Sequence, residues 1–157
     1  MTADSRFLEA TQMLGLSFDV DIKIGGNYVS VVRDGEVVYV SGQVPRVGSS
    51  VVVTGRVGEE VTLEQARLGA KICVMRALVL LQQELGSLEN IRQVLRVTVY
   101  TQSASTFSQQ SEVADAASDL LHFVLGVPGK HTRTSVGVYQ LPKNASVELD
   151  LIASVKA

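Results

Sequence analysis

The sequence has few of the features that mark exported and membrane proteins. It contains one cysteine, Cys73, so no internal disulfide can form. Charged residues interrupt the N-terminal stretch, and no later segment reaches the roughly 18 consecutive apolar residues that a membrane span requires. A lone thiol without an export signal is typical of the reducing cytoplasm, where we expect this protein to act, without a membrane partner.

The sequence also lacks the patterns of nucleic-acid-binding and metal-binding proteins. The formal net charge is -2 and no run of basic residues is present, so we expect no nucleic-acid partner. His122 and His131 have no cysteine, histidine or carboxylate at metal-ligand spacing, and neither CxxC nor HExxH occurs. The glycines at 25–26 and 126–129 lack the spacing of nucleotide-binding loops. We therefore expect neither a metal nor a cofactor.

Local signals predict a helix and a hairpin in the N-terminal half. A capping aspartate predicts a short helix over residues 4–14. Two β-branched runs, 29–32 and 37–40, flank the dipeptide Asp34-Gly35. This dipeptide accepts the positive φ angles of a tight turn, so the two runs should pair as a hairpin.

Two longer helices are predicted further along the chain. Thr62 and Gln65 have the spacing of a capping box, and the segment to Leu85 contains no proline, which predicts a long helix. Apolar residues occupy most of its circumference, so we expect it to be covered on more than one side. Capping-box spacing recurs at Thr106 and predicts a second helix that runs to Gly126.

Strands over residues 94–101, 133–141 and 146–155 complete the predicted elements. The order is helix, strand, strand, helix, strand, helix, strand, strand. It fits a single α+β domain over residues 1–157, with its core from about residue 20 and two long helices on one face of the sheet. The other face is left without a cover from the chain itself.

The last two predicted strands carry polar side chains at alternate positions. If they pair as a hairpin with matched apolar faces, five polar side chains share one sheet face: Arg133, Ser135, Tyr139, Glu148 and Asp150. A guanidinium can hold a substrate carboxylate while a separate carboxylate acts as general base, so a substrate site is one interpretation. An ordinary solvated sheet face is the other, and spacing alone favours it.

Three groups of motifs carry a family resemblance. They are Gly-Asn-Tyr-Val at 26–29, Val-Ser-Gly-Gln-Val-Pro at 40–45, and a C-terminal block over 133–149 with Arg-Thr-Ser-Val, Leu-Pro-Lys-Asn and Val-Glu-Leu. With these motifs and their spacing, nearly the whole chain resembles the YjgF/RidA family, also called the L-PSP endoribonuclease or translation inhibitor family. The resemblance implies a chorismate-mutase-like fold and a homotrimer with clefts between neighbouring subunits.

The resemblance also implies an activity and residue roles. RidA-type members hydrolyse reactive imines and enamines to 2-oxo acids and ammonia without a cofactor. Matched by position, Arg133 would bind the substrate carboxylate and Glu148 would help to activate water. Tyr28 would close the pocket, and Ser41 and Gly42 would line it.

Departures from the family pattern leave alternatives open. Ser135 stands where many members have a cysteine, so it would line the pocket without supplying a thiol. The helix over 4–14 and a longer segment before Arg133 indicate a divergent branch. Cys73 lies among apolar residues and is expected to be buried. A non-catalytic protein that binds a small carboxylate is the alternative function, and RNA cleavage is disfavoured by the acidic charge.

Overall fold

One five-stranded sheet forms the centre of the molecule, and its strands lie in the order β1-β2-β7-β5-β6. The computed structural model describes residues 1–18, 22 and 24–157, so the predicted start of the core near residue 20 lies outside the described residues. The strands are β1 (Val31–Asp34), β2 (Val37–Gln43), β5 (Ile91–Gln102), β6 (Thr132–Val138) and β7 (Val147–Val155). A separate two-stranded ribbon consists of β3 (Arg46–Val47) and β4 (Ser50–Val51).

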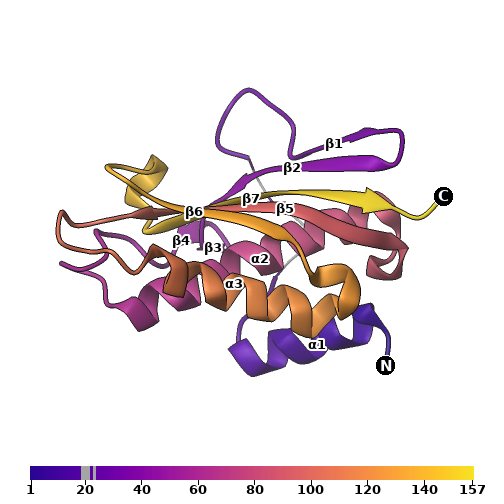
Figure 1. Ribbon diagram of the computed structural model, residues 1–157, viewed down its shortest axis with the longest axis horizontal. Coiled ribbons are helices and arrows are strands. Elements are labelled where there is room, and N and C mark those ends of the chain that lie inside the picture. The colour runs from indigo at the N-terminus through magenta and orange to yellow at the C-terminus, as the bar shows by residue number, and fades with distance from the viewer. Residues whose placement is uncertain (19–21, 23) are drawn as a thin grey trace.

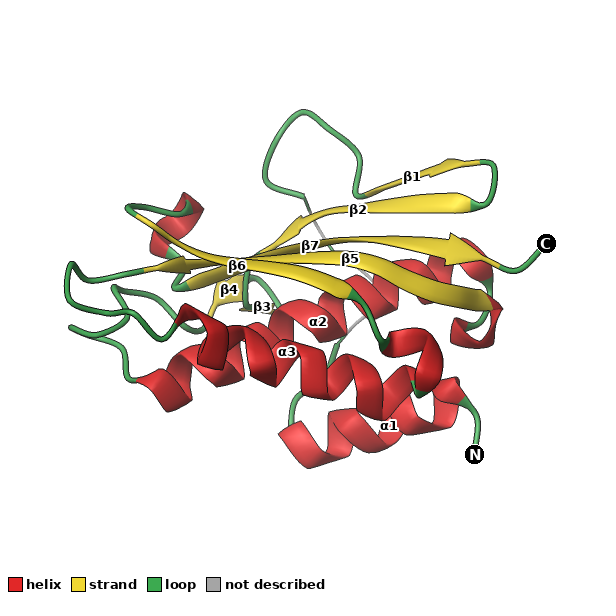
Figure 2. Ribbon diagram, in the orientation of Figure 1, coloured by secondary structure: helices red, strands yellow, loops and turns green. Residues whose placement is uncertain are grey.

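The helices lie on one face of this sheet (Figures 1 and 2). α2 (Leu63–Leu85) and α3 (Gln110–Leu125) pack next to each other, and α1 (Ala3–Leu14) packs on the outside of α3. Short 3-10 turns are η1 (Leu88–Asn90), η2 (Val127–Gly129) and η3 (Pro142–Asn144). The predicted α+β fold, with a mainly antiparallel sheet and two long helices on one face, is confirmed. Among the described residues, no helix has both the length and the apolarity to cross a bilayer.

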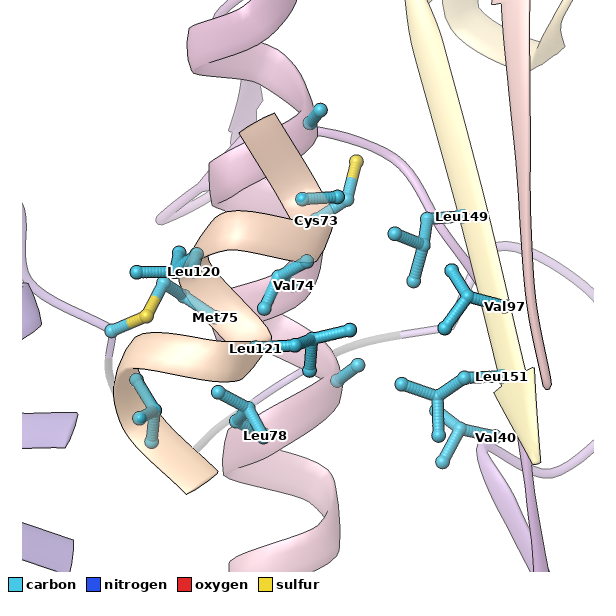
Figure 3. Packing of buried hydrophobic residues seen from close by; sticks show 14 of the residues in the cluster. Val40, Cys73, Val74, Met75, Leu78, Val97, Leu120, Leu121, Leu149 and Leu151 are labelled. Carbon is cyan, nitrogen blue, oxygen red and sulfur yellow. The ribbon is translucent and has the colours of Figure 1, made fainter. Parts of the chain in front are cut away.

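α2 is covered on two sides, as its apolar circumference predicts. The capping box forms, because Thr62 Oγ1 accepts the Gln65 N–H at 3.1 Å and Gln65 Oε1 accepts the Thr62 N–H at 2.9 Å. Every side chain from Ile72 to Leu81 is buried, including the thiol of Cys73. Figure 3 shows how residues of α2 and α3 pack toward the sheet residues Val40, Val97, Leu149 and Leu151.

Two local predictions have opposite outcomes. The β1–β2 hairpin forms as expected, with Gly35 at φ 63° in its turn. The capping box predicted at the start of the second helix is wrong, since α3 begins at Gln110 and Gln109 occupies the N-cap without a side-chain hydrogen bond. Thr106 lies instead in a turn, which a backbone hydrogen bond from the Phe107 N–H closes.

The last two strands do not pair as a hairpin, which was the condition for their polar residues to share one face. β5 lies between β6 and β7, and it pairs parallel with β6 and antiparallel with β7. α3 supplies the crossover that a parallel pair requires. Arg133 is aligned with Val97, whereas Glu148 is aligned with Tyr100. Because Val97 and Tyr100 point to opposite sheet faces, Arg133 and Glu148 also do, and they do not share a face within one protomer.

Candidate functional site

A cavity of about 460 Å³ contains four of the residues that the sequence predicts for the site. Ser41 and Gly42 come from the end of β2, Glu148 comes from the start of β7, and Tyr28 comes from the segment before β1. The volume falls in the range of about 300–1,000 Å³ that is typical of small-molecule sites. The motif positions at both ends of the chain therefore converge on one cavity.

Gly42 makes room for the carboxyl group of Glu148. Between Val40 and Gln43, β2 has one residue more than the paired stretch of β7, which is a β-bulge. A Cβ atom on Gly42 would lie 2.2 Å from Oε2 of Glu148 and 2.9 Å from its Cδ. Only a residue without a side chain leaves the Glu148 carboxyl in this place.

Ser41 joins β2 to the segment that carries Tyr28. Its Oγ donates to the Val29 carbonyl at 2.7 Å, and its backbone N–H donates to the Ser30 carbonyl at 2.9 Å. The ring of Tyr28 lies over Gly26, where an added Cβ would meet Cε1 at 2.8 Å. The hydroxyl of Ser41 thus positions the wall of the cavity, and the half-exposed Tyr28 stands at its edge.

The electrostatic environment of Glu148 favours its protonated form. Burial raises the pKa of Glu148, and the nearby carboxylate of Asp150 raises it further. Asp150 itself accepts a hydrogen bond from the Tyr100 hydroxyl at 3.1 Å, and burial raises its pKa as well. In the described part of the chain, no ion pair neutralises Glu148. A carboxyl group in such a setting is suited to accept and return a proton nearer neutral pH.

Arg133 lies outside this cavity, which corrects the predicted shared polar face. Its guanidinium is held by α3: Nη1 lies 2.8 Å from Asp115 Oδ1 and 3.0 Å from Ser118 Oγ, and Nη2 lies 3.0 Å from Ser111 Oγ. Its side chain is 20% exposed and borders an open hollow that His131 and Lys130 also line.

Ser135 and Tyr139 are also separated from Glu148. Ser135 is aligned with Val99 and so shares the face of Arg133. Tyr139 lies beyond the end of β6, is 83% exposed, and its ring centroid lies 4.7 Å from the Arg56 guanidinium carbon. Within one protomer, Asp150 alone remains with Glu148 from the predicted set.

Two arginines that no sequence motif singled out line the cavity with Glu148. Arg76, in α2, is only 6% exposed, and Arg46 lies in β3. Arg76 Nε donates to Gln43 Oε1 at 3.1 Å, and its Nη1 donates to the Arg46 carbonyl at 3.2 Å. Burial lowers the pKa of Arg76, and the positive charge of Arg46 lowers it further. The sequence does contain a signal for Arg76, because it is an arginine inside the apolar run of α2. Burial of a charge at such a position is unfavourable unless a partner or ligand interacts with it.

Metal ligands are not grouped in the part of the chain that the structure describes, which contains no cluster of three or more histidine, cysteine, aspartate or glutamate side chains fit to hold an ion. His131 uses both ring nitrogens: Nε2 lies 2.8 Å from Ser118 Oγ, and Nδ1 lies 2.6 Å from the Gly129 carbonyl.

The fold and the motif residues around this cavity define a class of protein. Residues 19–155 match the Endoribonuclease L-PSP family, and the chain belongs to this family, the YjgF/RidA family of the sequence resemblance. Protein TCP17 of Trypanosoma cruzi is 34% identical over 99% of this chain and 98% of its own length.

Solved structures show the same architecture. The protein Atu1372 of Agrobacterium tumefaciens, whose function is described as unknown, has a TM-score of 0.89 and 35% identity over 98% of this chain and 95% of its own. The YjgF gene product of E. coli has a TM-score of 0.59 and 20% identity over 82% of this chain and 88% of its own. This last likeness concerns the fold alone.

Proposed function

We propose that this protein is a cofactor-independent deaminase that hydrolyses reactive 2-imino acids and enamines to 2-oxo acids and ammonia. The observation that carries the proposal is Glu148, a carboxyl group with a raised pKa that lies unpaired, among the described residues, in a cavity with Tyr28, Ser41 and Gly42. These are the positions to which the family resemblance assigns water activation and substrate contact.

The reaction needs one group that moves protons. The ionised Glu148 takes a proton from a water molecule as the water oxygen bonds to the carbon of the protonated imine, and the C=N π electrons become the lone pair of a neutral amine. The protonated Glu148 then gives this proton to the amine. The C–N bond of the resulting ammonium group breaks, the hydroxyl proton passes to Glu148 as the C=O bond forms, and ammonia leaves. A group that both accepts and donates works best when its pKa is close to the working pH, which is the direction of the shift at Glu148.

Arg133 can serve this cavity only from another subunit. Within one protomer it lies on the opposite sheet face and is bound to Asp115. The role of carboxylate anchor that the resemblance implies for Arg133 would require the homotrimer that we propose, in which a neighbour faces each cavity. We also propose a cytoplasmic location, with which the free, buried thiol of Cys73 is compatible.

The activity can be measured directly. Purified protein is mixed with 2-aminoacrylate generated in situ, and pyruvate formation is followed beside the uncatalysed rate. We expect acceleration by the wild type and its loss in Glu148→Gln, which keeps the shape of the side chain but cannot take a proton. A folded wild type that forms pyruvate no faster than buffer would exclude the proposal. The same protein is incubated with RNA in parallel, because the older name of the family is endoribonuclease.

A binding protein without turnover is the second candidate. The two arginines in the cavity favour an anionic ligand whether or not chemistry follows. This candidate predicts that 2-oxo acids raise the melting temperature while no imine is hydrolysed.

A further inference from the structure

The cavity that contains Glu148 is also lined by two arginines, and no ion pair with a described residue balances the charge of either. Arg76 projects from α2 and Arg46 from β3, so the two come from segments 30 residues apart in sequence. The two residues are neighbours in the cavity wall, because Arg76 donates a hydrogen bond to the backbone carbonyl of Arg46. Lys143, in η3, lines the cavity as a third cation.

The hydrogen bonds of Arg76 leave part of its guanidinium unused. Its two partners, Gln43 Oε1 and the Arg46 carbonyl, are neutral acceptors. Its Nη2 has no hydrogen-bond partner in the described residues, and the only ion pairs found there are Arg92–Glu36 and Arg133–Asp115. An arginine that is only 6% exposed and has neutral partners alone is an unfavourable arrangement unless an anion completes it, because buried charges are normally paired.

Arg46 points to the same conclusion independently. Its Nε is buried and has no hydrogen-bond partner in the described part of the chain. An orphaned donor of this kind is rare in folded proteins and needs an explanation. The adjacent positive charge of Arg76 adds repulsion between the two guanidinium groups, which a shared anion would relieve.

The opposite charge inside the cavity is Glu148, and it does not pair with either arginine at salt-bridge distance. The cavity, of about 460 Å³, is therefore lined by cations and by a carboxyl group that do not form an ion pair with one another. A small 2-imino acid has matching polarity, since it carries a carboxylate next to an electrophilic C=N carbon.

We propose that Arg46 and Arg76 form the subsite that binds the carboxylate of the ligand, within the same protomer that supplies Glu148. This assignment rests on the proposed function only for the nature of the ligand. It differs from the role that the sequence resemblance gives to Arg133, which requires a second subunit. Guanidinium groups suit this task because they present paired N–H donors to both carboxylate oxygens.

The test measures binding of pyruvate, 2-oxobutyrate and 2-oxoglutarate by calorimetry and by the shift in melting temperature. Methyl pyruvate, which has no charge, serves as the matched ligand. We expect pyruvate to bind and methyl pyruvate to bind at least about tenfold more weakly, as the loss of a charge-assisted contact predicts. Equal binding of the two would overturn the proposal, and so would the absence of binding of all three oxo acids at millimolar concentration.

Arg76→Met and Arg46→Met locate the anchor, because methionine fills similar space without a charge. Each should weaken pyruvate binding by about 10- to 100-fold. Arg33→Met is the matched control, since Arg33 is exposed on β1 outside the cavity and should leave binding unchanged. Arg46 is less buried than Arg76, so its variant keeps the test open if Arg76→Met does not fold.

Arg133→Met separates the two possible anchors. If it abolishes binding while the Arg46 and Arg76 variants bind like the wild type, the carboxylate is held by Arg133 and the proposal is wrong. Binding that depends on Arg46 and Arg76 without any hydrolysis of imine would support the subsite and reject the deaminase. Failure of the two proposals can thus be told apart.

Discussion

Replacement of Gly42 by alanine tests whether the position of the Glu148 carboxyl controls the proposed deaminase activity. The new Cβ would lie 2.2 Å from Glu148 Oε2, whereas ordinary contact begins near 3.4 Å, so the oxygen has to retreat by about 1.2 Å. The obstacle is the far end of a flexible side chain, which can rotate away, so the fold should survive. A misplacement of about 1 Å in a reacting group can cost about 100-fold in rate. We therefore expect kcat for imine hydrolysis to fall by about 100-fold.

The assay compares kcat, far-ultraviolet circular dichroism and melting temperature of the wild type and Gly42→Ala. Gly25→Ala is the matched control, because it adds the same methyl group to the same cavity where no atom lies within 4 Å. It should retain kcat within about threefold, since a surface substitution of this kind changes free energies by about 0.5 kcal/mol.

A double-mutant cycle shows whether the effect passes through Glu148. In a Glu148→Ala background no carboxyl group remains to be displaced, so Gly42→Ala should cost nothing further. Additive losses from the two substitutions, or full activity of a folded Gly42→Ala protein, would refute the reasoning.

Three further predictions concern pH dependence and stability. The pKa of Glu148 is raised in the folded state, so ionisation of this carboxyl destabilises the fold as pH rises through that pKa. Glu148→Gln should therefore raise the melting temperature at pH 8. Calorimetry should show that this gain disappears below about pH 4, where the carboxyl is protonated in both the folded and the unfolded state. Asp4 accepts hydrogen bonds from Gln82 and Ser87, and hydrogen bonding outweighs the effect of burial and lowers the pKa of Asp4. The stability that the ionised carboxylate contributes is therefore lost as pH falls through this lowered pKa. Asp4→Ala should lower the free energy of unfolding in urea at pH 7 by about 1–3 kcal/mol, and an unchanged urea midpoint would contradict this. Leu121→Ala removes a fully buried side chain between α3 and the sheet and should cost about 2–5 kcal/mol in the same measurement, with a loss below 1 kcal/mol arguing against the packing described.

Local sequence signals were sufficient for most of the secondary structure. The capping box of α2 and the Asp34-Gly35 turn depend on residues close in sequence, so their geometry follows from the residues themselves. The start of α3 was mispredicted because the capping-box spacing at Thr106 competes with a turn at 104–107, whose first residue donates its N–H to the carbonyl of the distant Val57. Tyr28 and Glu148 were found from motif resemblance, and the structure brings them into one cavity.

The sequence by itself determined which side chains alternate along each strand, but only the tertiary structure decided which strands are neighbours. Alternation places Arg133 and Ser135 together, yet the insertion of β5 between β6 and β7 puts Arg133 and Glu148 on opposite faces. Strand order depends on how α3 crosses over the sheet and on the apolar area buried by the whole chain, which no local pattern reports. The meeting of Arg46 and Arg76 with Glu148 has the same origin, because three distant segments form one cavity only after the core has packed.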